Sequence, residues 1–162
     1  MGIKYRKPKG TRDLMFLEME RWQWCENKWR EVLSRFGYGE IRTPSFESTS
    51  LFTRSVGSGT DIVDKEMYTF DSKGGESLSL RPEATASVVR AYLENGLTRQ
   101  PGTVKFYYMG PMFRYDRPQA GRYRQFHQVG VEAIGSESPI LDAEVVRTAT
   151  ALFEAVGADD LT

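Results

Sequence analysis

Hydrophobic residues recur every three or four positions in two long stretches of this chain, and this spacing predicts two amphipathic helices. The first covers residues 15–36 and ends before Gly37, a residue type that often terminates helices. The second covers residues 139–156. The residues expected to face the core are Trp22, Cys25, Trp29, Val32, Leu33 and Phe36 in the first helix, and Leu141, Val145, Val146, Ala149, Leu152 and Phe153 in the second.

A third helix is predicted after the sequence Arg81–Pro82–Glu83, because proline favours the start of a helix and glutamate suits its first turn. This helix runs to about Asn95 and is ended by Gly96. Glu83 and Thr85 then lie where a strand meets a helix, a position from which side chains often reach a ligand. Helix capping explains the same residues equally simply, and both interpretations stay open.

Runs of aromatic and β-branched residues predict strands at 66–70 and 77–80, paired across the turn DSKGGE, and at 38–47, where Pro44 confines the strand to an edge or interrupts it. Short helical turns and a VGSGTD loop are expected between these elements. The longest strands are residues 103–114 and about 124–134, joined by a loop that Pro118 and Gly121 mark. Helices mixed with hairpins in 162 residues predict one domain of the α+β class.

Alternation along residues 124–134 divides the outgoing strand into two faces. His127 falls on the same face as Val129, Val131 and Ala133, which suits the core, so we expect it to be a packed core histidine. The opposite face carries Phe126, Gln128, Gly130 and Glu132. An amide and a carboxylate are unexpected on a strand that should be central, and they indicate a small polar pocket.

Charge is balanced over the whole chain, with 22 basic and 22 acidic residues, but not in this hairpin. Between Arg99 and Val131 there are six basic residues and one acidic residue, Asp116. Arginine binds phosphate through two parallel hydrogen bonds, so the cluster Arg114, Arg117, Arg122 and Arg124 predicts a phosphate clamp. A solvated hairpin tip explains these charges as well, and residue types alone do not decide between the two.

A few single residues complete the picture. Cys25 is the only cysteine and His127 the only histidine, so we expect no disulfide and no zinc site, and Cys25 is interpreted as a small buried hydrophobic residue. Trp24 lies off the apolar stripe of its helix, and either contacts a partner subunit or is simply exposed. No apolar run approaches the length that crosses a membrane, and a reducing cytoplasm is the expected compartment.

Several segments, in order, resemble the N-terminal part of the catalytic domain of histidyl-tRNA synthetases. YGEIRTPSFE resembles the first class II motif, which forms the dimer interface in the family, and MFRYDRPQAGRYRQFHQ resembles the second motif with its loop. KGTRD, KEMYTF and LSLRPEATA are similar to histidine-specific stretches. The resemblance implies a class II aminoacyl-tRNA synthetase-like antiparallel sheet flanked by helices, truncated so that residues 1–162 lack the third motif and the anticodon-binding domain.

The resemblance also implies roles for individual residues. The ATP-binding residues are Arg114, which is catalytic and contacts the α-phosphate, Arg122 near the γ-phosphate, Phe126 stacked on adenine, and Asp116, where the family usually carries glutamate. The histidine-binding residues are Glu83, Thr85 and Gln128 around the ammonium group and Glu132 at the imidazole. Gln119 and Arg124 would approach the tRNA acceptor end. Mg²⁺ would bind through the ATP phosphates, with no metal held by the protein itself.

The activity that follows is histidine–tRNA ligase: ATP-dependent formation of histidyl-adenylate and transfer to tRNA(His), weak or absent in so short a chain. The expected partners are ATP, histidine, tRNA(His) and a second subunit in a homodimer. One alternative is the synthetase-like regulatory subunit of ATP phosphoribosyltransferase in histidine biosynthesis, against which the intact arginine loop argues. A nucleic-acid-binding module is the other, and the neutral net charge counts against it.

Overall fold

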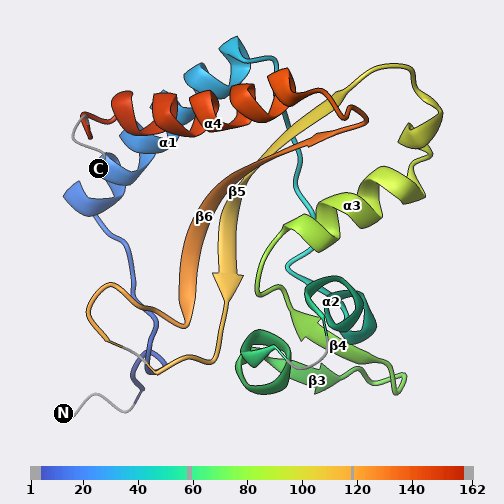
Figure 1. The fold of residues 1–162 in the computed structure, drawn as a ribbon. Coiled ribbons are helices and arrows are strands. Elements are labelled where there is room, and N and C mark those ends of the chain that lie inside the picture. The colour runs from blue at the N-terminus through green and yellow to red at the C-terminus, as the bar shows by residue number, and fades with distance from the viewer. Residues whose placement is uncertain (1–4, 58–59, 118, 159–162) are drawn as a thin grey trace. The chain divides into compact units, whose positions relative to one another are not determined.

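The computed structural model describes residues 5–57, 60–117 and 119–158 of the chain (Figure 1). Pro118 and residues 58–59 of the VGSGTD segment therefore lie outside the described residues. The chain divides into two compact units. The first unit contains residues 5–13, 42–95 and 109–130, and the second contains residues 14–41, 96–108 and 131–158.

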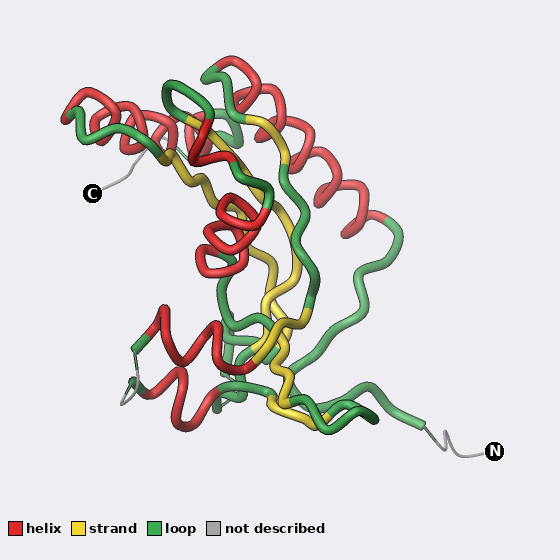
Figure 2. Tube along the Cα trace, turned by 90° about the vertical axis from the view of Figure 1, so that its right-hand side faces the viewer, coloured by secondary structure: helices red, strands yellow, loops and turns green. Residues whose placement is uncertain are grey.

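The predicted helices are confirmed to within about two residues at each end (Figure 2). Gly37 and Gly96 follow the first and third of them with positive φ angles of 76° and 66°, which glycine adopts without strain. The described α-helices are α1 (Leu17–Arg35), α2 (Thr49–Val56), α3 (Thr85–Glu94) and α4 (Pro139–Glu154). Two shorter elements are a π-helical turn, η1 (Ile62–Glu66), and a 3-10 turn, η2 (Leu97–Arg99).

The long hairpin is confirmed as β5 (Val104–Phe113) and β6 (Gln125–Ile134). With β1 (Gly39–Glu40) these strands form a sheet in the order β1-β5-β6. The α+β class is confirmed, but this sheet is mixed, because β1 runs parallel to β5, with Gly39 opposite Phe106. A strand that reaches its neighbour only after a long crossover, as β1 does, can enter the sheet in the parallel direction. Among the described strands β5 is central, and β6 lies at the edge.

The second hairpin is confirmed as β3 (Thr69–Asp71) and β4 (Ser77–Leu80), which pair antiparallel. The Ser72 hydroxyl accepts hydrogen bonds from the amides of Gly74 and Glu76 and so stabilises the turn. β2 (Phe46–Ser48) pairs with the other side of β4, giving the order β2-β4-β3. Pro44 thus separates β1 from β2, and the two short strands belong to different sheets.

The division of β6 into a core face and a polar face is not what the structure has. His127, expected in the core, is exposed, while Val129 and Val131 are half-buried. Gln128 and Glu132 on the other face are half-buried too. Residues 128–134 are all half-buried, so neither face of β6 is fully covered and alternation there does not separate a buried face from a solvent face.

In the second unit, α1 and α4 lie side by side (Figure 1). Val32, Leu33 and Leu152 are buried, and the Trp29 indole N–H donates to the Leu152 carbonyl at 3.0 Å. The expected stripe of α4 is partly wrong: Thr148 is buried, whereas Val146 and Phe153 are exposed. A threonine is accepted there because its hydroxyl donates to the carbonyl one turn earlier, at Glu144.

An ion pair of the same unit lies beside the buried ring of Tyr38. The Lys105 ammonium contacts the Glu144 carboxylate at 2.6 Å and lies 5.6 Å from the centre of the Tyr38 ring. Burial raises the pKa of the Tyr38 hydroxyl above its ordinary value, and the Glu144 charge raises it further. Elsewhere in this unit Cys25 is half-buried, as a small core residue would be, and Trp24 is exposed.

The core of the first unit contains Phe52, Val88 and Met112, all fully buried. Beside these apolar residues lies Arg81, which is only 7% exposed. Its Nε donates to the Pro111 carbonyl at 2.9 Å, and its Nη1 donates to the carbonyl and hydroxyl oxygens of Thr43 at 3.0 and 3.1 Å. A buried guanidinium is tolerated only when such acceptors replace water. Arg81 therefore joins a segment that lies 38 residues before it in the sequence to one that lies 30 residues after it.

We predict that Arg81→Met lowers the free energy of unfolding by at least about 2 kcal/mol, because an acceptor that loses its buried partner costs about 1–3 kcal/mol. Urea unfolding of the chain measures this change. Arg21→Met, on the exposed surface of α1, is the matched control and should stay within about 0.5 kcal/mol of the parent. Equal stability of the two variants would show that Arg81 contributes nothing specific.

Candidate functional site

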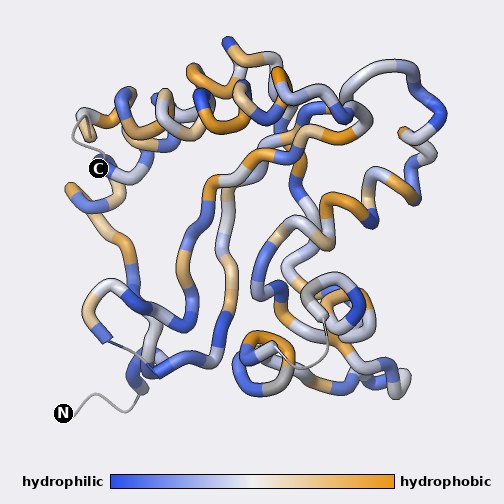
Figure 3. The backbone as a smooth tube through the Cα atoms, viewed as in Figure 1, coloured by the Kyte–Doolittle hydropathy of each residue, from blue (hydrophilic) through white to orange (hydrophobic). Residues whose placement is uncertain are grey.

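A pocket of about 540 Å³ in the first unit collects side chains from η1, from the β5–β6 loop and from the start of β6. Four of the predicted ATP-site residues line it: Arg114, Asp116, Arg122 and Phe126. The chain on both sides of the loop is hydrophilic where it leaves β5 and enters β6 (blue in Figure 3). The remaining lining residues are Ile62, Glu66, Gly121, Tyr123 and His127.

Arg114 is half-buried and anchored. Its Nε donates to the Pro82 carbonyl at 2.9 Å, and its guanidinium carbon lies 5.3 Å from the centre of the Phe126 ring. Among the described residues, none accepts a hydrogen bond from its two terminal nitrogens. Arg114 therefore presents an oriented cation whose donors are available to a ligand in the pocket.

Arg122 is held more loosely than Arg114. Its Nη1 binds the Asp116 carboxylate at 2.9 Å, but its side chain is 61% exposed. The other Asp116 oxygen accepts from the Arg117 amide at 2.6 Å, and Gln119 and Arg122 form a short bridge at the tip of the loop. Asp116 thus orients the loop by binding both its backbone and its arginine.

Glu66 and His127 line the pocket, and the sequence pattern assigned neither of them to it. Glu66 arrives from the π-helical turn nearly fifty residues before the loop, where its carbonyl accepts from the Tyr115 amide at 2.6 Å. In the sequence, the only signal for Glu66 is the similarity of KEMYTF, which contains it, to a histidine-specific stretch. The pocket therefore holds two carboxylates opposite two arginines, and it is less cationic than the hairpin sequence alone indicates.

The residues predicted to bind histidine are not among those that line this pocket. The Glu83 carboxylate accepts from the Ala86 amide at 3.1 Å and so caps the first turn of α3, where Thr85 is exposed. Gln128 is half-buried on β6, and its Oε1 is a buried acceptor for which no described residue is a donor. Glu132 lies four residues further along β6, in the second unit.

Arg124, predicted at the tRNA acceptor end, is held inward. Its guanidinium carbon lies 3.8 Å from the centre of the Tyr115 ring, and its Nε donates to the Asp116 carbonyl at 3.2 Å. Gln119, the other residue predicted there, is exposed at the tip of the loop. Arg124 is therefore half-buried and bound within the protein, whereas Gln119 is exposed to solvent.

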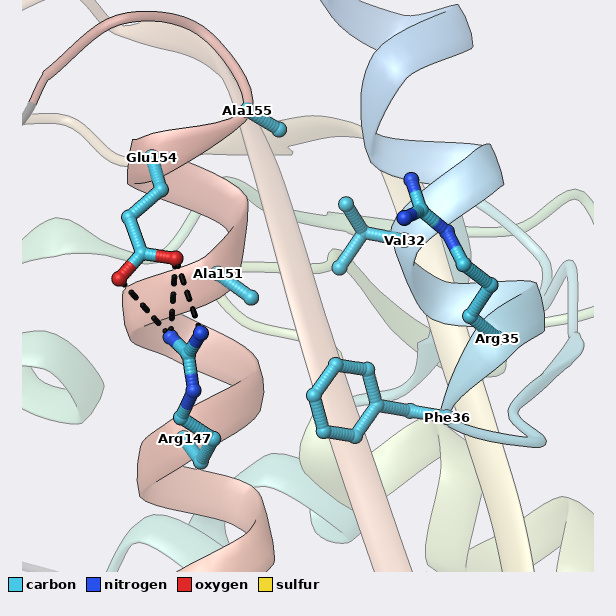
Figure 4. A pocket seen from close by; sticks show the side chains of 7 residues that line it. All are labelled: Val32, Arg35, Phe36, Arg147, Ala151, Glu154 and Ala155. Atoms are coloured by element: carbon cyan, nitrogen blue, oxygen red, sulfur yellow. Dashed lines mark hydrogen bonds and ion pairs between the residues drawn. The ribbon is translucent and has the colours of Figure 1, made fainter.

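A second pocket, of about 330 Å³, lies between α1 and α4 in the second unit (Figure 4). Val32, Phe36 and Ala151 form its apolar wall. Three charged residues line it: Arg147 and Glu154 of α4 bind each other at 2.9–3.0 Å, and the Arg35 Nε of α1 donates to the Glu31 carbonyl at 3.3 Å. Because these groups already have partners within their own helices, the pocket around Arg114 is the candidate site.

Two features are absent from the described residues. No group of three or more histidine, cysteine, aspartate or glutamate side chains there could hold a metal ion. No helix in that part of the chain is long and apolar enough to cross a membrane.

Comparison with known proteins identifies the family of the chain. The family model described as histidyl-tRNA synthetase matches residues 10–162. Histidine–tRNA ligase of Desulforamulus reducens is 58% identical over 155 residues, and that of Fervidobacterium nodosum is 57% identical over 156. Each alignment covers 96% of this chain but only 37% of the relative. The chain thus spans little more than a third of the length of the curated relatives it matches.

Solved structures give the same result. The apo histidyl-tRNA synthetase of S. aureus superposes with a TM-score of 0.80 at 44% identity, over 94% of this chain and 35% of that one. A Bacillus halodurans protein named as an ATP phosphoribosyltransferase regulatory subunit/histidyl-tRNA synthetase superposes with a TM-score of 0.81 at 25% identity, over 97% of this chain and 39% of that one.

Helices combined with mixed sheets, with a pocket built on an arginine-rich hairpin, define an α+β fold of the synthetase type. The family match covers nearly the whole chain, and the chain belongs to the histidyl-tRNA synthetase family.

We predict that Arg122→Ala weakens binding of tripolyphosphate to the chain, while Arg117→Ala does not. Both residues are exposed arginines of the same loop, but only Arg122 lines the pocket. Removal of one charge-assisted hydrogen bond should cost about 1.5–3 kcal/mol of binding free energy. Isothermal titration measures both affinities, and equal losses would assign the effect to net charge instead of to the pocket.

Proposed function

We propose that this chain is the part of a class II histidine–tRNA ligase that binds ATP and histidine, and that the protein it belongs to joins histidine to tRNA(His). The observation that carries the proposal is the convergence of Arg114, Arg122 and Phe126 on one pocket of the first unit. Two oriented cations beside an aromatic ring are what a nucleoside triphosphate requires. Isothermal titration with ATP, followed by histidine, tests the proposal.

ATP would place its α-phosphate on Arg114, which lines the pocket and whose Nε is fixed to the Pro82 carbonyl. Arg122 would reach the γ-phosphate, since its exposed side chain can exchange Asp116 for a phosphate oxygen. Adenine would stack on Phe126. Mg²⁺ would enter on the ATP phosphates, and Glu66 and Asp116 give the pocket carboxylate oxygens of the kind that this ion prefers. Bound there, the ion would neutralise phosphate charge.

Histidine would bind through Glu83, Thr85, Gln128 and Glu132. Gln128 supports this assignment, because its buried Oε1 lacks a donor among the described residues and an α-ammonium group would supply one. Glu132 would accept the proton of an imidazole nitrogen. A site built to accept such a hydrogen bond rejects apolar analogues, since they leave the buried acceptor unsatisfied.

The chemistry needs no nucleophile from the protein. A carboxylate oxygen of histidine attacks the α-phosphorus of ATP, the bond to the bridging oxygen breaks, and pyrophosphate leaves as histidyl-adenylate forms. The terminal ribose hydroxyl of tRNA then attacks the carbonyl carbon, loses its proton, and AMP leaves. Catalysis consists of positioning the reactants and stabilising the charge that develops on phosphate, which Arg114 is oriented to do.

The remaining parts of the proposal concern the wider protein. Residues 1–162 would be one partial catalytic domain that carries the first two class II motifs. Gln119, exposed at the loop tip, would approach the tRNA acceptor end. We further propose a homodimer through the first motif and a cytoplasmic location.

A regulatory subunit of ATP phosphoribosyltransferase is the second candidate, favoured by the superposition on the Bacillus halodurans protein. That protein is 25% identical to this chain, whereas the Desulforamulus reducens ligase is 58% identical. The presence of the arginines in the pocket also favours the ligase. Binding of ATP by the chain supports the ligase, and failure to bind it favours the regulatory subunit.

We predict that Arg114→Ala weakens ATP binding by about 1.5–3 kcal/mol, the usual contribution of a hydrogen bond to a charged group. Arg99→Ala, which removes an exposed arginine from η2, is the control with the same change in net charge. Titration of both variants with ATP measures the difference. Small and equal losses would support the solvated hairpin tip in place of the phosphate clamp.

We also predict that Glu132→Gln removes the preference for histidine over an apolar analogue of the same size, because an amide presents a donor where the carboxylate only accepts. Competition binding with histidine and the analogue measures the preference. Glu137→Gln, an exposed position beyond β6, is the control. Retained preference in Glu132→Gln would place histidine recognition elsewhere.

A further inference from the structure

Arg124 is enclosed by backbone contacts on both sides. Its amide donates to the Gly10 carbonyl at 2.7 Å, and its own carbonyl accepts from the Arg114 amide at 2.9 Å. The backbone hydrogen bonding of the β5–β6 hairpin thus extends to the N-terminal arm, residues 5–13. A displacement of Arg124 would move the backbone of Arg114, a residue that lines the pocket.

The side chain of Arg124 is also turned toward the protein. Its stem packs against Gly10, where an added Cβ atom would lie 2.7 Å from the Arg124 Cγ. Its guanidinium group covers the Tyr115 ring at 3.8 Å and donates from Nε to the Asp116 carbonyl. A guanidinium group fixed in this way acts through its planar shape as well as through its charge.

The arm is fixed on the loop by contacts of its own. The Thr11 amide and hydroxyl both donate to the Pro8 carbonyl, at 3.2 and 2.8 Å, and form a tight turn around Gly10. Gly10 has a φ angle of +83°, which residues with a side chain rarely adopt. Arg12 lies over the ring of Tyr123, which lines the pocket, at 5.0 Å from its centre.

Tyr115 also contacts Glu66 at the end of η1 and Tyr68 just after it. The Tyr115 and Tyr68 rings meet edge to face at 5.5 Å, and the Tyr115 amide donates to the Glu66 carbonyl. Three segments distant in sequence therefore meet at Arg124 and Tyr115: the arm, the end of η1 and the β5–β6 loop. Glu66, whose carbonyl binds the Tyr115 amide, and Arg114, which precedes Tyr115 in the chain, both line the pocket.

We propose that Gly10 and Arg124 are positioning residues: the arm, acting through the stack of Arg124 on Tyr115, fixes Arg114 and the wall of the nucleotide pocket. This proposal rests on the proposed function for the identity of the ligand. It assigns Arg124 a role inside the protein, in place of a direct contact with phosphate or tRNA. Without the arm, the hairpin would keep its sequence but lose the alignment of its arginines.

The test compares Gly10→Ala with Gly75→Ala. Gly75 has the same φ angle of +83°, but a Cβ atom there meets nothing within 4 Å, so it reproduces the backbone strain without the collision with Arg124. Gly10→Ala should weaken ATP binding at least about tenfold, since a displaced Arg114 would lose a charge-assisted hydrogen bond to phosphate. Gly75→Ala should leave the affinity unchanged. Equal affinities in the two variants would overturn the proposal.

A double-mutant cycle separates positioning from direct contact. Arg124→Ala and Tyr115→Leu should each weaken ATP binding, and the double variant should be little worse than either single one, because both remove the same stack. If Tyr115→Leu is silent while Arg124→Ala weakens binding, Arg124 contacts the ligand directly and the proposal fails.

Amide hydrogen exchange provides a readout that needs no ligand. Gly10→Ala should accelerate exchange at Arg114 and Arg124 about tenfold or more relative to Gly75→Ala, with the amides of α4 unchanged. If the parent chain does not bind ATP, the proposed function fails for this chain, and the exchange rates still decide whether the arm fixes the hairpin. Unchanged exchange at Arg114 would overturn the inference.

Discussion

The buried guanidinium of Arg81 is the constraint on which the first unit depends. Its Nε binds the Pro111 carbonyl, three residues before Arg114, while the Nε of Arg114 binds the Pro82 carbonyl, one residue after Arg81. Each arginine thus donates to a backbone carbonyl in the chain segment that contains the other arginine. Gly110 permits this arrangement, because a Cβ atom there would lie 2.7 Å from a terminal nitrogen of Arg81. A charge that costs so much to bury holds the two segments together through several hydrogen bonds at once.

This pair of reciprocal contacts connects the two halves of the proposed site. Arg81 and Pro82 lead directly into Glu83 and α3, the region assigned to histidine, while Arg114 lines the pocket assigned to ATP. The Arg81 amide and carbonyl add hydrogen bonds to Ser45 and Phe113. The orientation of the proposed catalytic arginine is therefore decided by packing in the core as well as by the loop that follows it.

The sequence predicted those parts of the fold that local patterns decide. α1, α3, α4 and both hairpins follow from periodicity and from glycines with positive φ angles, since these signals act within one element. Glu66 and His127 were missed in the pocket, because Glu66 comes from a turn far away in the sequence and alternation assigned His127 to the core. Alternation failed on β6 because it assumes one covered face and one solvated face, whereas residues 128–134 are half-buried on both faces. The position of Arg114 was predicted through the resemblance, but its anchor at Pro82 was not, since a contact across 32 residues leaves no local pattern.

The two arginines of the pocket differ in how firmly they are held, and this difference suits a triphosphate. Arg114 is tied to a carbonyl and half-buried, so little conformational entropy remains to be lost when it binds an anion. Arg122 is bound to Asp116 in an exposed ion pair, an interaction that typically contributes only about 0–1 kcal/mol. A phosphate oxygen can replace that carboxylate at small cost, whereas it would have to distort the core to move Arg114. If the proposed function holds, the pocket combines a rigid cation for the α-phosphate with an adjustable one for the γ-phosphate. The backbone of Arg124 is hydrogen-bonded both to Arg114 and to Gly10 of the arm.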